Sequence, residues 1–537
     1  MKFISNYKYN LILAGFILLL FFLNAYNLTF NYKPTLAHQW RQSDCLSIAK
    51  NYYEEGMNFF QPKIHWQGTK GGRAVSELPI LNFTVAALWK VFGQSEGIYR
   101  LFNYLIYVLA IFILYSTFNI LNKSRLLTFF LVSLLLTSPL LCYYSYNFLS
   151  DVPAFSLAII SFCLFFKFYY HRKAWLFYLS LAIGALAVFL KASAAVPIIV
   201  ITLFSLADFL NLNKKLKTPK LFNRRVLPAV SILAMYILII LWYGFARHYN
   251  VANNSGVFLL DVLPVWDMTE KDILKNLRDL LSDLLPIFFN RPVLFIFVIS
   301  SIYVWFNLKQ LDSLLKYAFI ISFTSFILFI VLFFKVFDVH DYYLVNMMIL
   351  PVITFLCLAK ILETKTILVT RHRWVVTSLI IIIVFNSFYS AAFYRLRTIK
   401  DDKICYWYPF FSTIETKYHT GDMWMYSKTM ALLGTVTADL RKLGIKRDDL
   451  FISVPDVSPN SSLYLMDQKG YTLSPDEFSK DTTWKSRCHF YDCKYFVISD
   501  TVFRDSLSFK LIATDLERVF KKERVEVYKI KKPANAF

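Results

Sequence analysis

Charged residues are scarce in this sequence of 537 residues. Only 18% of the residues are Asp, Glu, Lys or Arg, whereas 57% are hydrophobic and 18% are aromatic. A water-soluble protein of this length could not bury so much apolar surface. The composition therefore excludes a soluble protein and indicates an integral membrane protein.

The motifs of several common binding sites are also missing. The 14 glycines form no phosphate-binding loop, and the seven cysteines have no spacing typical of a zinc site. No internal repeat is present, which argues against a transporter built from repeated halves. Cys488 and Cys493 lie close together in the sequence, and both a disulfide and two free thiols are open alternatives for this pair.

Long apolar runs fill much of the chain. Runs of about 17 to 25 apolar residues are typical of transmembrane helices and too long for barrel strands. The sequence thus predicts an α-helical polytopic membrane protein with about 11 spans. The predicted spans are 10–30, 99–118, 126–143, 152–170, 175–190, 193–210, 227–247, 290–307, 315–336, 343–361 and 373–393.

Basic residues in the short loops predict the orientation of these spans. The segment 211–225 is rich in Lys and Arg and holds no acid, which is typical of a cytoplasmic loop. The N-terminus is then cytoplasmic, and the loop 31–97 and the chain after residue 393 lie outside. The net charge of +22 is attributed to this bias and to contact with anionic membrane lipids, and nucleic-acid binding is not expected.

Two domains are predicted. Residues 1–393 form the membrane domain with its long first outer loop 31–97, and residues 394–537 form a small extracytoplasmic α/β domain with a mostly parallel sheet. Strands are expected at 450–454, 495–498 and 525–530, and a capped helix is expected from Ser474. In the first outer loop, 43–53 and 78–91 are expected as amphipathic helices at the membrane surface.

Polar residues at the outer ends of the spans are candidates for chemistry, because charges near the membrane are costly to bury. The acidic candidates are Asp44 and Glu77 in the first outer loop and Asp151 at the start of the fourth span. All candidates lie on one predicted side, so we expect them to converge on one outward-facing cavity. The others are Arg41, Lys191, Lys335, His340, Asp341, Tyr342 and Tyr343.

Simpler roles compete with catalysis at each position. Arg41 and Asp44 could form a surface ion pair, and Glu77 could be an ordinary loop acid. Asp151 could be a charge at a helix N-terminus, and Lys191 could be a snorkelling lysine. His340, Tyr342 and Tyr343 could belong to an interfacial aromatic belt.

Transfer of a sugar from a polyprenyl phosphate needs groups of this kind. A base activates the acceptor hydroxyl, and cations or a metal ion stabilise the departing phosphate. No nucleotide is required. Asp44 suits the base, and Glu77 and His340 could hold a divalent metal ion. The candidates for the phosphate are Lys191, Arg41 and Lys335.

The pattern resembles the polytopic GT-C glycosyltransferases of the protein O-mannosyltransferase and lipid A aminoarabinose transferase families. These families place a carboxylate early in the first outer loop, which matches Asp44, and an aspartate at the outer start of the fourth span, which matches Asp151. Glu77 before Leu-Pro, Lys191 and the stretch His340–Tyr343 match further family positions. The resemblance covers residues 1–393. The lipid A enzyme has Lys-Pro-Pro in place of Glu-Leu-Pro here.

The resemblance implies a transferase of the bacterial inner membrane. It would move a sugar from an undecaprenyl-phosphate donor to an extracytoplasmic lipid, glycan or protein acceptor, with Asp44 as the general base. Two alternatives come from other classes of protein: a transporter or flippase of lipid-linked sugars, and a non-enzymatic membrane scaffold with the outer domain as its binding module. The scaffold would tolerate the loss of Asp44.

Overall fold

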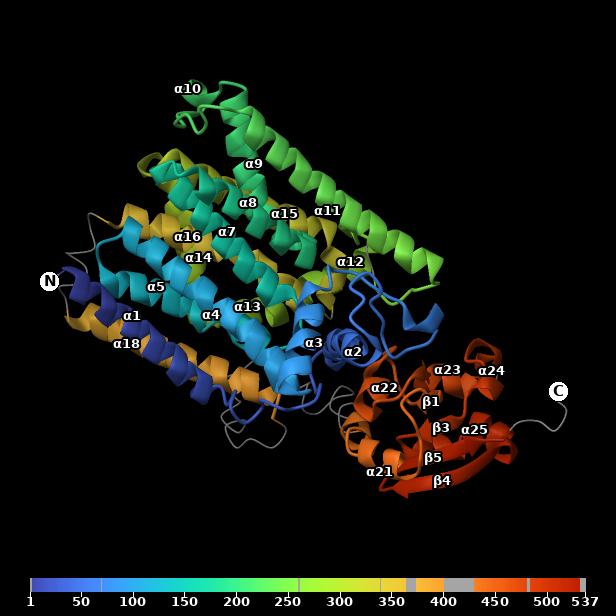
Figure 1. The fold of residues 1–537 in the computed structure, drawn as a ribbon. Coiled ribbons are helices and arrows are strands. Elements are labelled where there is room, and N and C mark those ends of the chain that lie inside the picture. The colour runs from blue at the N-terminus through green and yellow to red at the C-terminus, as the bar shows by residue number, and fades with distance from the viewer. Residues whose placement is uncertain are drawn as a thin grey trace. The chain divides into compact units, whose positions relative to one another are not determined.

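The computed structural model describes residues 2–68, 70–258, 261–338, 340–363, 373–399, 429–480 and 483–531 (Figure 1). The chain divides into two compact units. The helical unit comprises Met1–Phe30, Arg100–Trp242 and Asp261–Ile414. The α/β unit comprises Asn31–Tyr99, Tyr243–Leu260 and Glu415–Phe537. The α/β unit therefore contains both the first predicted outer loop and the C-terminal segment. The predicted division of the chain at residue 393 stays a prediction.

The helical unit consists of apolar helices. Its main helices are α1 (Lys2–Leu23), α4 (Glu96–Leu121), α5 (Arg125–Leu136), α6 (Pro139–Ser145), α7 (Asp151–His171), α8 (Ala174–Leu190), α9 (Val196–Phe209), α11 (Val226–Ala252), α14 (Arg291–Phe306), α15 (Ser313–Leu332), α16 (Ile349–Ile361) and α18 (Arg373–Leu396). Shorter helices join them: α10 (Asn213–Leu216), α12 (Glu270–Asp279), α13 (Leu285–Phe288), and the 3-10 helices η6 (Phe334–Asp338) and η7 (Asp341–Met348).

These helices make the chain a multi-pass membrane protein. Within the described residues, seven helices are long and apolar enough to cross a membrane, or nine if each of two bent pairs counts as one span. The first and fifth predicted spans overlap the shorter apolar helices Lys8–Leu23 and Ala174–Leu190. The polytopic helical fold is confirmed, whereas the number of eleven spans stays a prediction.

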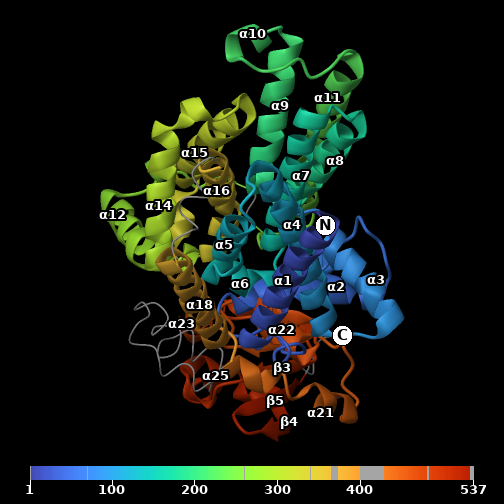
Figure 2. The ribbon, with the colours of Figure 1, turned by 90° about the vertical axis from the view of Figure 1, so that its left-hand side faces the viewer.

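Helix α7 lies in the interior of the helical unit. In its most apolar stretch 89% of the residues are buried, against 22% for α11, whose exposed Leu and Ile side chains suit a lipid environment. Gly184 of α8 lets this helix approach α7 closely, because a Cβ atom there would lie 2.7 Å from Ser161 Oγ. Figure 2 shows α14, α15 and α16 grouped on the other side of the unit. Dense packing therefore surrounds α7 along its length.

The α/β unit contains a five-stranded sheet in the order β2-β1-β3-β5-β4. The strands are β1 (Phe451–Val454), β2 (Gly470–Thr472), β3 (Tyr495–Ile498), β4 (Leu516–Lys522) and β5 (Val525–Ile530). Strand β1 pairs in parallel with β2 and β3, whereas β5 pairs antiparallel with β3 and β4. The expectation of a mostly parallel sheet is therefore wrong. The cause is the tight hairpin between β4 and β5, which can only join antiparallel strands.

Short helices accompany this sheet. They are α2 (Gln39–Glu55), α3 (Ile80–Phe92), α21 (Thr437–Lys442), α22 (Ser461–Met466), α23 (Pro475–Lys480), α24 (Trp484–Arg487) and α25 (Leu507–Ile512). The predicted cap at Ser474 is confirmed, since Ser474 Oγ accepts a hydrogen bond from the backbone of Glu477 at 3.3 Å.

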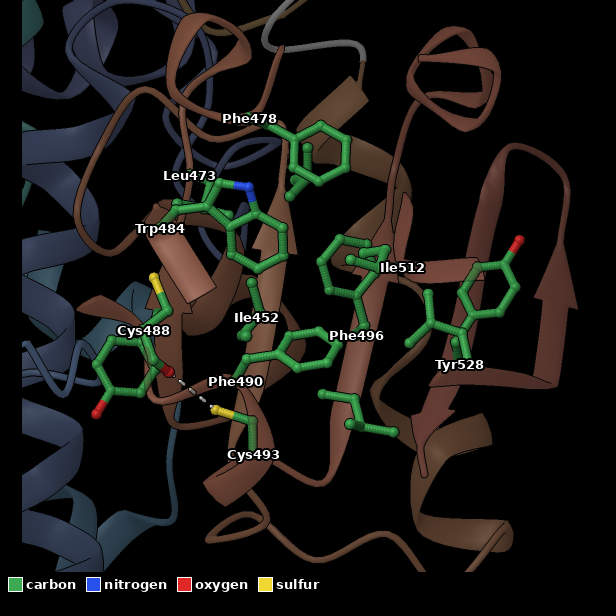
Figure 3. Close-up of a cluster of buried hydrophobic side chains, with 14 of the residues drawn as sticks. Ile452, Leu473, Phe478, Trp484, Cys488, Phe490, Cys493, Phe496, Ile512 and Tyr528 are labelled. Carbon is green, nitrogen blue, oxygen red and sulfur yellow. Dashed lines mark hydrogen bonds between the residues drawn. The ribbon is translucent and has the colours of Figure 1, made fainter. Parts of the chain in front are cut away.

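Both faces of the sheet are covered, as alternation along its strands requires. Ile452 and Phe496 point into the aromatic core of Figure 3, together with Trp484. Phe451 and Val497 point into the core on the opposite face. The sheet is therefore the middle layer of the unit.

Cys488 and Cys493 lie in the aromatic core and are not bridged (Figure 3). The Cys493 thiol instead lies 3.5 Å from the carbonyl oxygen of Cys488, at hydrogen-bond distance for sulfur. Of the two alternatives raised by the sequence, the structure has the pair of free thiols.

A segment of the first predicted outer loop pairs with the edge of this sheet. Trp66 forms a parallel bridge with Gly470 of β2, and Gln67 donates its backbone N–H to the Gly470 carbonyl at 2.7 Å. Gly470 has φ +154°, and a Cβ atom there would lie 1.9 Å from Phe451 O. Only glycine fits this close approach. The pairing connects α2 and α3 to the C-terminal sheet by backbone hydrogen bonds.

Candidate functional site

Asp44 lies in α2 and is buried, with 5% of its surface exposed. Its Oδ1 atom has no hydrogen-bond partner among the described residues. Burial raises the pKa of this carboxyl to about 7, although the charge of Arg41 and a hydrogen bond from Asn460 lower it. A carboxyl group that titrates near neutral pH can both take up and release a proton, as a general base must.

Arg41 and Glu77 form an ion pair beside Asp44 in the α/β unit. Arg41 Nη2 lies 2.5 Å from Glu77 Oε1, and the Arg41 guanidinium lies over the ring of Phe258. Ser76 donates a hydrogen bond to the other oxygen of Glu77. Glu77 is thus held by a cation, and this contact orients the Arg41 side chain. The ion pair gives Glu77 a structural contact, and its catalytic role stays a prediction.

Asp151 and Lys191 form the corresponding pair in the helical unit. Asp151 is fully buried in the first turn of α7, and Lys191 follows the last residue of α8. Lys191 Nζ lies 3.3 Å from Asp151 Oδ1. The side chain of Lys191 is only 12% exposed, so it does not extend to the membrane surface as a snorkelling lysine does.

Aromatic rings flank Lys191. Its Nζ atom lies 5.4 Å from the ring centre of Tyr342 and 5.3 Å from that of Tyr343, within the range of cation–π attraction. The ring of His340 lies 5.4 Å from that of Tyr342. The stretch His340–Tyr343 therefore gathers around a buried lysine, a contact that an aromatic belt at the membrane surface would not need.

Asp341 has a different environment. Arg397 Nη1 lies 2.6 Å from Asp341 Oδ2, and the side chains are 1% and 2% exposed. Tyr144 donates a hydrogen bond to the other oxygen of Asp341. These contacts fix η7, whose Tyr342 and Tyr343 contact Lys191. Arg397 was not predicted as a site residue, because it follows the last predicted span and the sequence assigns it to the outer domain.

Lys335 and the metal-ion hypothesis gain no support. Lys335 is exposed on η6, and its role as a phosphate ligand stays a prediction. Glu77 and His340 lie in different units, and no three His, Cys, Asp or Glu side chains gather as a metal site in the part of the chain that the structure describes. The metal ion also stays a prediction.

The predicted site residues therefore form two clusters. The α/β unit brings together Asp44, Arg41 and Glu77. The helical unit brings together Asp151, Lys191, His340, Tyr342 and Tyr343. Convergence of the two clusters on one cavity stays a prediction. Asn460, which donates a hydrogen bond to the carbonyl oxygen of Ser43 next to Asp44, was also missed, because it lies more than 400 residues away in the sequence.

Comparison with known proteins places this geometry in a known fold. No protein-family model and no curated protein matches the sequence. Among solved structures, ArnT from Cupriavidus metallidurans in the apo state is similar, with a TM-score of 0.58 and 10% identity over 98% of each chain. ArnT bound to undecaprenyl phosphate has a TM-score of 0.56 and 10% identity, over 97% of this chain and 98% of that one.

A third similar structure comes from an archaeon. The oligosaccharyltransferase AglB from Archaeoglobus fulgidus, in complex with an inhibitory peptide and a dolichol-phosphate, has a TM-score of 0.50 and 12% identity, over 99% of this chain and 75% of that one. The likeness covers the α/β unit as well as the helical unit. This chain has the fold that ArnT and AglB share, the GT-C fold that the sequence resemblance implied.

Proposed function

We propose that this protein is a membrane glycosyltransferase that moves a sugar from a polyprenyl-phosphate donor to an extracytoplasmic lipid, glycan or protein acceptor. The observation that carries the proposal is Asp44, a buried carboxyl with a pKa of about 7 and one oxygen atom without a hydrogen-bond partner among the described residues. The fold shared with structures that hold undecaprenyl phosphate or a dolichol-phosphate supports the class of donor.

In the proposed reaction, Asp44 accepts the proton of the acceptor hydroxyl. The hydroxyl oxygen attacks the anomeric carbon of the sugar, and the bond between that carbon and the phosphate oxygen breaks. Polyprenyl phosphate leaves with the bonding electron pair. The base removes a proton only in its charged form, so a carboxyl that titrates near neutral pH suits this step.

Lys191 is the proposed ligand of the departing phosphate. It carries a positive charge beside the Asp151 carboxylate and the rings of Tyr342 and Tyr343, and these contacts orient it before the donor binds. A cation held in place in a site shielded from water stabilises developing negative charge strongly. Arg41 would add a second cation once the two clusters meet around the substrate.

The protein would then lie in the bacterial inner membrane, with its N-terminus in the cytoplasm and the α/β unit outside. The basic segment 211–225 supports this orientation. A lipid-linked donor presented at the outer surface would reach both clusters there.

A deletion strain tests the proposed function. Mass spectrometry of its envelope lipids, glycans and proteins should find one sugar modification missing, and the wild-type gene should restore it. The variant Asp44→Asn should not restore it, whereas the control Asp448→Asn should, because the Asp448 side chain is 75% exposed. Full restoration by Asp44→Asn would contradict the enzyme and favour a scaffold.

Two bent helix pairs favour a second candidate, a flippase of lipid-linked sugars. Helices α5 and α6 meet at 66° before Pro139, and the segment Glu270–Phe288 meets α14 at 96° before Pro292. Broken helices are a feature of many transporters. Vesicles that contain the purified protein, a lipid-linked sugar and an acceptor separate the two functions. A flippase would move the intact lipid-linked sugar across the vesicle membrane and would leave no sugar on the acceptor, whereas a transferase would leave sugar on the acceptor.

A further inference from the structure

The loop after β1 lies outside the residues assigned to the proposed reaction. Asp456 organises this loop and is 2% exposed. Its Oδ1 atom accepts hydrogen bonds from the backbone N–H of Ser458 at 2.9 Å and from the Ser458 hydroxyl at 2.8 Å. Its Oδ2 atom accepts one from the backbone N–H of Ser462 at 2.7 Å. These bonds give the loop a fixed conformation that ends at Asn460.

Asn460 contacts α2 of the first predicted outer loop through both ends of its amide. The side chain is fully buried. Its Oδ1 atom accepts hydrogen bonds from the backbone N–H of His65 at 3.1 Å and from the Ser47 hydroxyl at 3.4 Å. Its Nδ2 atom donates to the carbonyl oxygen of Ser43 at 3.3 Å. Because Oδ1 faces donors, the orientation of the amide is fixed, and the NH2 group points to the turn of α2 that carries Asp44.

A second contact holds the same two segments together. Asp467 is the residue directly after α22. Its Oδ1 atom lies 3.0 Å from Lys50 Nζ of α2 and 3.2 Å from Arg447 Nε. The His65 ring is 3.7 Å away from the same oxygen. His65 contacts both Asn460 and Asp467, so these partly buried ion pairs help to keep the amide against α2.

We propose that Asn460 is a positioning residue for Asp44, so that the C-terminal segment supplies part of the catalytic site and is more than an appended binding module. The inference rests on the proposed role of Asp44 as the general base. Asparagine suits this position because its amide oxygen accepts two hydrogen bonds while its NH2 group donates to the carbonyl oxygen next to Asp44. A carboxylate could not donate, and an aliphatic side chain could do neither.

Two residues of this loop, Asn460 and Asp456, shift the pKa of Asp44 in opposite directions. The hydrogen bond from Asn460 lowers the pKa of Asp44, whereas the negative charge of Asp456 raises it. Removal of the amide should therefore raise the pKa above its value of about 7. Loosening of the site, by contrast, would admit water and lower the pKa toward the ordinary value of 3.8. The sign of the shift separates the two effects.

Infrared difference spectroscopy of the purified full chain in detergent can measure this shift without a substrate. The carboxyl stretch of Asp44 is identified by subtracting the spectrum of Asp44→Asn made in the same background, and the band is followed against pH. We expect Asn460→Ala to raise the midpoint by about 1 unit, as the loss of a hydrogen bond to a charged group predicts. Asn460→Asp should raise it further, because it keeps the shape and adds a charge. If Asn460→Ala does not fold, Asn460→Asp alone decides.

The matched control is Ser461→Ala. Ser461 is fully buried next to Asn460, and its hydroxyl has no hydrogen-bond partner among the described residues, so the midpoint should not move. An unchanged or lowered midpoint in the Asn460 variants would overturn the inference. Because the titration needs no activity, this outcome is distinct from a failure of the proposed reaction, which the Asp44→Asn complementation test reports.

Discussion

Lys191 Nζ lies 3.3 Å from Asp151 Oδ1, so the residue that follows α8 and the first residue of α7 are joined by a buried ion pair. Breaking such a pair leaves a buried carboxylate without its cation. In the proposed reaction the same lysine also meets the donor phosphate. The pair therefore connects the stability of the helical unit to donor binding.

The first prediction concerns this lysine. The variant Lys191→Gln should bind undecaprenyl phosphate about 10-fold or more weakly, since a hydrogen bond to a charged group contributes about 1.5–3 kcal/mol. Binding can be measured by native mass spectrometry of the protein in nanodiscs. Lys309→Gln, at an exposed lysine of the same unit, is the control and should bind as the wild type does. Equal affinity of Lys191→Gln and the wild type would exclude Lys191 as a phosphate ligand.

The second prediction concerns convergence. The acceptor hydroxyl, the anomeric carbon and the phosphate react within a few ångströms of one another, so both clusters must face one substrate. An experimental structure in nanodiscs with bound undecaprenyl phosphate should place Asp44 and Asp151 around one cavity, less than about 15 Å apart. A larger separation without a shared cavity would remove the physical basis of the two-cluster site.

The third prediction concerns Asp467, which joins α2 to the C-terminal sheet. Burial alone would raise the pKa of this carboxyl, but the hydrogen bond to His65 and the charge of Lys50 outweigh burial and hold the pKa well below its usual value of 3.8. Burial lowers the pKa of His65 to about 4, so at neutral pH the His65 ring lies 3.7 Å from Asp467 without carrying a charge. The positive charges come from Lys50, Arg441 and Arg447.

Asp467→Asn should therefore destabilise the protein by about 3–5 kcal/mol at neutral pH. A lowered carboxyl pKa stabilises the fold above the unfolded pKa of 3.8, and this contribution is lost as the pH falls below it. The difference in Tm from the wild type should shrink between pH 7 and pH 3, whereas the exposed control Asp448→Asn should differ little at either pH. A Tm deficit that does not depend on pH would contradict the electrostatic explanation.

The fourth prediction concerns topology. Reporter fusions within 211–225 should report the cytoplasm, and fusions after residue 537 should report the outside. A cytoplasmic C-terminus would move Asp44 to the wrong face for a donor used outside the membrane.

The sequence predicted the fold class and several elements, because these depend on local patterns. Long apolar runs located the helices, and short strand-like segments located β1, β3 and β5. The capping residue Ser474 located the start of α23. Strand β2 was missed because Gly470 is typical of a turn. It forms a strand because the first predicted outer loop and β1 both approach its backbone closely.

Partners of the site residues could not be predicted in the same way. The position of Asp44 after the first span made it a candidate, but nothing local indicates that Asn460 contacts it. The pair Asp341–Arg397 likewise joins segments that lie far apart in the chain. The sequence interval between Arg41 and Asp44 suggested an ion pair, yet the Arg41 side chain contacts Glu77. Such pairings depend on tertiary packing, which no spacing rule encodes.

The fifth prediction concerns the pH dependence of activity, which follows from the pKa of Asp44. A base that is active in its charged form should lose activity as the pH falls below about 7. Asp44→Asn should fold at least as well as the wild type above that pH, because it removes the cost of a buried charge. A loss of activity in this variant would then report chemistry and not unfolding.

The central claim is tested most directly by turnover of the lipid donor. Lipid extract and membranes from the deletion strain, which should accumulate donor and unmodified acceptor, are incubated with the purified protein, and release of polyprenyl phosphate is followed by mass spectrometry. The account predicts release by the wild type and a rate about 10²–10⁴-fold lower for Asp44→Asn at pH 8. Near-wild-type release by Asp44→Asn, or no release by the wild-type protein, would contradict it.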